Sequence, residues 1–170
     1  MNINLNAYEV LAIAEEVKRN GVNFYRHISK YCRDAETRKV LLDLSEMEYR
    51  DAEWFLQMRL GLSDDEKATT RFDPQTDAWI YMRDIIDTNV YDVRHDPCER
   101  LSGRSDVKDV LRAAIELEKD AIVFFLNLKR HILSRDRSDK IDIIIRGQMR
   151  HIVILSNELG LLESSALLMR

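Results

Sequence analysis

The sequence predicts an all-α fold, a bundle of four long helices with a long connection in its middle. Of the 170 residues, 33% are charged and 45% are hydrophobic, with only five Gly and two Pro. That composition favours long helices over all-β or loop-rich folds. Apolar residues recur at helical spacing in four segments. The two halves of the chain also match at an offset of one hundred residues, which predicts a helical hairpin repeated about a two-fold axis.

The first helical hairpin is expected over residues 5–60. An asparagine cap at Asn4 or Asn6 precedes its first helix, and Asp34 caps its second helix, which ends at Gly61. Because only a few residues separate the two helices, they should lie antiparallel to each other.

Residues 61–105 are expected to connect the two hairpins and not to form a second domain. Within them, Asp73 and Pro74 place a cap before a proline at the first helical position, which predicts a short extra helix. If a two-fold axis relates the hairpins, the second main helix runs parallel to the third. A helix of about 27 residues is about 40 Å long, so this crossover has to travel the length of the bundle.

The second hairpin is expected over residues 106–160, after a cap at Ser105, and its second helix should end near Gly160. The C-terminal tail, residues 161–170, carries four Leu and one Met, more than a free terminus normally exposes. We expect it to pack back on the bundle or to form an oligomer contact, which predicts a homo-oligomer, a dimer. Residues 1–170 then make a single domain.

Charge and cysteine content exclude several classes of function. A net charge of −4 provides no basic surface for nucleic acid. Without an apolar run of about 18 residues or a signal-like N-terminus, neither membrane insertion nor secretion is expected, so we expect a cytoplasmic protein. Cys32 and Cys98 are far apart and belong to no CxxC motif, which is typical of reduced thiols in a reducing compartment.

Polar residues interrupt the inward apolar stripe of every main helix. The first and third helices have one such residue each, and the second and fourth have a pair three residues apart. They are Lys18, the pair Glu48 and Asp51, Glu118, and the pair Gln148 and His151. One polar position from each of two helices, plus an i, i+3 pair from each of the others, is the layout by which bundles build dinuclear carboxylate metal centres.

Longer motifs surround these positions. The first helix contains Ala14-Glu-Glu-Val-Lys-Arg-Asn-Gly-Val-Asn-Phe-Tyr25, and the third contains Ala114-Ile-Glu-Leu-Glu-Lys-Asp-Ala-Ile-Val-Phe-Phe125. With the two pairs, they resemble the ferritin-like superfamily and most nearly the rubrerythrin-like proteins, whose first helix reads roughly Ala-x-x-x-Glu-x-x-Gly-x-x-Phe-Tyr. That family also carries two Glu-x-x-His motifs. The resemblance covers all four main helices and implies a ferritin-like four-helix bundle with an iron site.

The departures from the family pattern change what the resemblance implies. Three of the six ligand positions keep the family residue: Glu48, Glu118 and His151. At the other three, Lys18 replaces a Glu, Asp51 a His and Gln148 a Glu. A protonated lysine cannot ligate a cation, so the resemblance implies at most one ion, iron or another divalent metal. The chain also lacks the paired CxxC segments of complete rubrerythrins, whose peroxidase activity is therefore not implied.

Two arrangements of charge are compatible with these residues. In the first, a single divalent ion binds near Glu48, Glu118 and His151, with Asp51 as a further acidic group. In the second, the site is free of metal, Lys18 forms a buried salt bridge to Glu48 or Glu118, and a protonated His151 lies beside Asp51. The metal-free state is the one that we favour from the sequence.

Three functions follow as hypotheses. The first is a rubrerythrin-related protein with a degenerate di-iron centre that binds one or no metal ion and has a binding or structural role. The second is an iron-dependent oxidoreductase that acts on oxygen, peroxide or iron through an altered centre at Glu48, Glu118 and His151. The third is an interaction module that oligomerises through residues 161–170.

Overall fold

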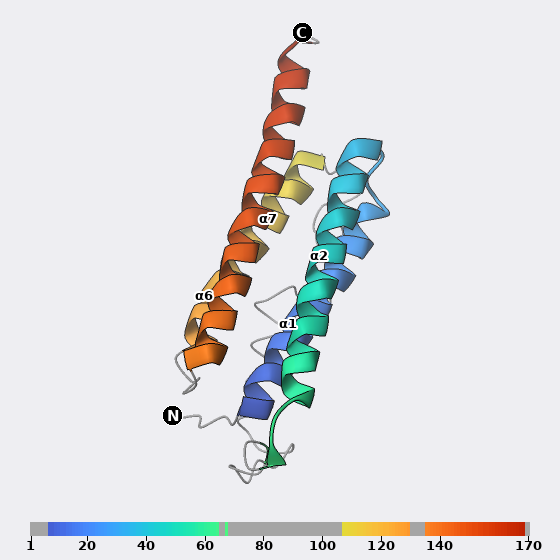
Figure 1. The fold of residues 1–170 in the computed structure, drawn as a ribbon. Coiled ribbons are helices and arrows are strands. Elements are labelled where there is room, and N and C mark those ends of the chain that lie inside the picture. Colours follow the sequence, from blue (N-terminus) through green and yellow to red (C-terminus); the bar gives the residue numbers. More distant parts are fainter. Residues whose placement is uncertain (1–6, 65–66, 68–106, 130–134, 169–170) are drawn as a thin grey trace, which may run out of the picture.

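A computed structural model of the chain describes residues 7–64, 67, 107–129 and 135–168. Four long helices make up almost all of this part, as Figure 1 shows. They are α1 (Ala7–Ser29), α2 (Ala35–Leu60), α6 (Val107–Lys129) and α7 (Arg135–Leu168). The predicted all-α helical bundle is therefore confirmed.

The chain closes each end of α2 as the sequence predicts. The carboxylate of Asp34 accepts a hydrogen bond from the backbone N–H of Thr37 at 2.7 Å, which satisfies a donor of the first turn. At the other end, the N–H of Gly61 donates to the carbonyl of Gln57 at 3.1 Å. Gly61 has a φ of −79°, so it ends the helix without the left-handed conformation that glycine often supplies there. The caps predicted before α1 and α6 lie outside the described residues.

The four helices form two antiparallel hairpins, α1 with α2 and α6 with α7. In Figure 1, α2 runs downward from cyan to green, and α6 also runs downward from yellow to orange. The parallel course predicted for these two helices is therefore confirmed. The end of α2 and the start of α6 lie at opposite ends of the bundle, which the connection has to join. The short helix predicted after Asp73 lies outside the described residues.

The core lies where the apolar stripes of the four helices meet. On α2 and α7, the stripe residues with 0 or 1% exposure are Leu41, Leu44, Phe55, Ile141, Ile144 and Leu155. Phe55 of α2 stacks on Phe125 of α6, with ring centroids 5.9 Å apart and an interplanar angle of 11°. Apolar packing thus joins the two hairpins above and below the polar residues that interrupt the stripes.

The outward faces of the helices carry mostly charged and polar side chains. Arg112 of α6 pairs with Asp109 one turn away at 3.0 Å and with Glu163 of α7 at 2.8 Å. None of the helices in the described ranges is long and apolar enough to cross a membrane.

The predicted end of the fourth helix near Gly160 is wrong, because α7 continues to Leu168. Leu159 and Leu162 flank the glycine and pack against the core, which offsets the low helix propensity of Gly160. The hydroxyl of Ser164 donates to the carbonyl of Gly160 at 2.9 Å, as in a continuous helix. Residues 161–168 thus extend α7, and Leu161 stays 65% exposed. The dimer contact assigned to this segment stays a prediction.

Replacement of Gly160 by alanine should test the continuous helix. A Cβ at Gly160 would meet nothing within 4 Å, so Gly160→Ala is expected to raise the free energy of unfolding by about 0.5–1 kcal/mol. Gly21→Ala is the matched control within α1 and should destabilise, because its Cβ would lie 2.8 Å from Glu48 Oε2. Urea unfolding measures both. A loss of stability in Gly160→Ala would mean that the helix ends at the glycine.

Candidate metal centre

The six polar residues that interrupt the stripes meet in the middle of the bundle. Lys18, Glu48, Glu118 and Gln148 are each 0% exposed, and His151 is 1% exposed. Only Asp51 reaches partly to solvent, with a side chain that is 24% exposed. Because Lys18 is fully enclosed, its long stem does not carry the ammonium out to water.

Each helix positions its polar residues by a simple geometric rule. Residues three apart on a helix project side by side, so α2 presents Glu48 and Asp51 together. On α1, Gly21 lies one turn beyond Lys18 and leaves space for the carboxylate of Glu48. A Cβ at Gly21 would lie 2.8 Å from Glu48 Oε2 and 3.1 Å from its Cδ. The glycine thus lets a carboxylate of α2 approach the backbone of α1.

The ammonium of Lys18 lies between the two carboxylates of α2. Its Nζ is 3.0 Å from Asp51 Oδ2, and 3.3 and 3.2 Å from Glu48 Oε1 and Oε2. The same nitrogen lies 5.4 Å from the ring centroid of Phe125, within reach of a cation–π contact. Burial alone would lower the pKa of Lys18, but Glu48, Asp51 and Glu118 together raise it above its ordinary value. Lys18 is therefore a permanent buried positive charge.

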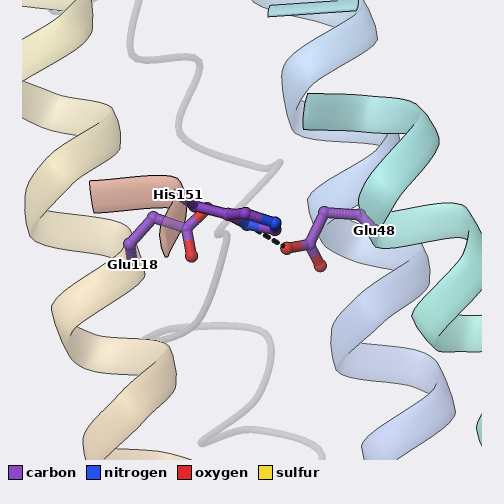
Figure 2. Close-up of side chains that lie close together, drawn as sticks. All are labelled: Glu48, Glu118 and His151. Carbon is purple, nitrogen blue, oxygen red and sulfur yellow. Dashed lines mark hydrogen bonds and ion pairs between the residues drawn. The ribbon is translucent and has the colours of Figure 1, made fainter. Parts of the chain in front are cut away.

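His151 joins two carboxylates from two other helices. Figure 2 shows the imidazole, from α7, between Glu118 of α6 and Glu48 of α2. Its Nδ1 is 3.0 Å from Glu48 Oε1 and 3.2 Å from Glu118 Oε1. Burial lowers the pKa of His151, but the hydrogen bonds and charges of Glu118 and Glu48 outweigh it and raise this pKa to about 9. The predicted placement of His151 beside Asp51 is wrong, because Asp51 pairs with Lys18 instead.

Tyr25 is a candidate functional residue that the pattern of stripe-interrupting residues does not include. Its hydroxyl donates a hydrogen bond to Glu118 Oε1, and its side chain is 0% exposed. Burial and the adjacent Glu118 hold the pKa of Tyr25 well above its ordinary value, so the phenol stays protonated. The signal was present, because Tyr25 follows Lys18 by two helical turns on the same face.

Gln148 supports the site as a neutral donor. Its Nε2 donates to Glu48 Oε1 at 3.2 Å, the same oxygen that contacts His151 and Lys18. Among the described residues, its own Oε1 has no hydrogen-bond partner, and neither has Glu118 Oε2. Two buried oxygens therefore have unused acceptor capacity inside the cluster.

Glu48, Glu118 and His151 could together hold a metal ion. One donor atom of each lies within 4.8 Å of the others. The separations of His151 Nδ1 from Glu48 Oε1 and Glu118 Oε1, 3.0 and 3.2 Å, are close to the roughly 3.3 Å between two ligands of a tetrahedral ion with bonds of about 2 Å. Carboxylate and imidazole together suit Fe, Mn or Zn. These three residues, from three helices, are the ones that would hold the ion.

Lys18 and Asp51 contribute a different chemistry to the other half of the cluster. The ammonium of Lys18 has three N–H donors and no lone pair, so it cannot itself act as a metal ligand. Lys18 also already occupies Asp51 Oδ2 at 3.0 Å. The part of the cluster around Asp51 is thus occupied by a lysine ammonium that contacts both carboxylates of α2.

These features define a helical bundle with a buried carboxylate and imidazole cluster, and the comparison with solved structures agrees with that class. The structure resembles the 2.30 Å crystal structure of a Thermotoga maritima protein that is described as a ferritin-like diiron-carboxylate protein, with a TM-score of 0.66. The two sequences are 25% identical. The match covers 94% of this chain and 98% of that chain. No protein-family model and no curated protein matches the sequence. The chain has the ferritin-like fold that its motifs predict.

The protonated His151 should make the metal-free protein sensitive to alkaline pH. Its pKa is about 9 when folded, against 6.5 ordinarily. The stabilisation is therefore complete below pH 6.5 and is lost as the pH rises to 9, by roughly 3 kcal/mol. Urea unfolding of chelator-treated protein between pH 6 and 9.5 measures it, with His151→Gln as the control. Equal pH dependence in both proteins would contradict the proton on His151.

Proposed function

We propose that this chain is a rubrerythrin-related ferritin-like protein whose dinuclear centre is reduced to a site for at most one divalent metal ion, and that it has a binding or structural role. The observation that carries this proposal is the ammonium of Lys18, which is 0% exposed and contacts both Glu48 and Asp51. The ammonium at this point supplies one positive charge, half that of a divalent metal ion, and a chelator cannot remove it.

The balance of charge supports a single ion in the remaining half of the site. Glu48, Asp51 and Glu118 carry three negative charges, and Lys18 with a protonated His151 returns two, which leaves one negative charge. A divalent ion that displaces the proton from His151 brings the sum to zero. Since buried charges are tolerated when they are compensated, the site should exchange a proton for a metal ion, with weaker metal binding at lower pH.

The surrounding side chains hold the ligands in place. Gln148 donates to Glu48 and Tyr25 donates to Glu118, so each of the two carboxylates has a hydrogen bond from a neutral donor. Such outer contacts orient metal ligands and are part of a site's affinity. A bound ion would supply Lewis acidity, or electron exchange if it were iron.

The metal content of the protein tests the proposal. Protein purified without chelator and then loaded anaerobically with Fe2+ should hold at most one equivalent per chain, by mass spectrometry of the metal. Glu118→Ala and His151→Ala should each lower this value at least tenfold at limiting metal, because each removes one of three ligands. The triple variant Lys18→Glu, Asp51→His, Gln148→Glu restores the family ligands and should approach two equivalents. Two equivalents of iron in the natural sequence would contradict the proposal.

A second candidate function, an iron-dependent oxidoreductase, draws support from the hydrogen bond that Tyr25 donates to Glu118. A buried phenol on a metal ligand can hold a proton close to the site. If this function is correct, the iron-loaded protein consumes oxygen or peroxide faster than free iron does, and Tyr25→Phe reduces the rate several-fold without a change in iron content. Rates equal to those of free iron, or unchanged in Glu118→Ala, would exclude it.

A further inference from the structure

We infer that the fixed charge of Lys18 restricts the site at Glu48, Glu118 and His151 to divalent ions and favours Fe2+ over Fe3+ there. This inference rests on the proposed function, because it concerns the one ion that those residues would hold. It assigns to Lys18 a role beyond the exclusion of a second ion, namely the choice of charge state for the first.

The total charge of the cluster with an ion bound favours a divalent ion. With His151 neutral as a ligand, the three carboxylates and Lys18 sum to two negative charges, which a divalent ion cancels. A trivalent ion would leave one positive charge among groups that are 0 or 1% exposed, apart from Asp51. An uncompensated buried charge is costly because water cannot solvate it, so the divalent state should be preferred.

Lys18 contacts one of the carboxylates that would bind the ion. Its Nζ lies 3.3 Å from Glu48 Oε1, the same oxygen that lies 3.0 Å from His151 Nδ1. The ammonium and the ion would therefore share one carboxylate. Lys18 competes for the negative charge of Glu48 and weakens it as a donor to the ion. This effect is larger for a more highly charged ion, and it is stronger in the interior than in water.

Lys18 cannot turn away from the site. Asp51 holds the ammonium at 3.0 Å on one side, and the ring of Phe125 lies 5.4 Å from it. The side chain is 0% exposed, so the ammonium lies inside the bundle and not at its surface. The charge is thus fixed in place and acts on every ion that binds.

Three variants separate the effect of the charge of Lys18 on the bound ion from the effect of its side-chain shape. Lys18→Met removes the positive charge with a side chain of similar length, and Asp51→Asn removes one negative charge. The double variant Lys18→Met, Asp51→Asn loses both, so its net charge equals that of the natural sequence. The measurement is the midpoint potential of the Fe3+/Fe2+ couple in the iron-loaded proteins, after Zn2+ titration calorimetry has shown that each protein binds one divalent ion.

The midpoint potential is expected to change according to the charge that each variant removes. Lys18→Met should lower the midpoint by at least 59 mV, which is a change of about tenfold in the ratio of Fe3+ to Fe2+ affinity. Asp51→Asn should raise it, by less because Asp51 is partly exposed, and the double variant should lie close to the natural protein.

The outcomes that overturn the inference differ from those that overturn the proposed function. If the natural protein binds neither Zn2+ nor Fe2+, the single-ion site itself is wrong. If it binds both and the midpoint of Lys18→Met stays within 59 mV of the natural value, the role of Lys18 in charge selection is wrong. Should Lys18→Met fail to fold, Asp51→Asn decides, since an unchanged or lower midpoint there contradicts the inference.

Discussion

The buried contact of the Lys18 ammonium with the carboxylates of Glu48 and Asp51 is the interaction on which the centre of this bundle depends. This contact joins α1 to α2 inside the apolar core. Glu48 also contacts His151 of α7, and His151 contacts Glu118 of α6. Removal of one partner from a buried pair costs about 3–5 kcal/mol, because the other charge is left uncompensated. The polar residues therefore hold four helices together at the level where the apolar stripes are interrupted.

The charges of the cluster show how a buried group of carboxylates can be compensated inside a helical bundle. A carboxylate cluster at the centre of a bundle needs positive charge to be stable. Metal ions can supply it, but here a lysine ammonium supplies one charge and a proton on His151 supplies another. The first is permanent and the second can be exchanged for an ion. Under the proposed function, this exchange is what lets the site take up a divalent ion.

Much of the fold was predictable from the sequence, because helical spacing and caps act locally. The cap at Asp34 and the end of α2 at Gly61 are local signals, and both were correct. Gly160 misled the prediction, since the packing of Leu159 and Leu162 against other helices decides whether the helix continues, and that information is not local.

The positions of the site residues were predictable from the sequence, but the contacts among them were not. The spacing on each helix identified all six inward polar residues. Which residues meet depends on the relative rotation and depth of the helices, which place His151 against Glu118 and Glu48 and leave Asp51 to Lys18. Anomalous diffraction from crystals loaded with Zn2+ is the decisive measurement for the single-ion site. One peak is expected among Glu48, Glu118 and His151. A second peak beside Lys18 and Asp51 would contradict a single-ion site.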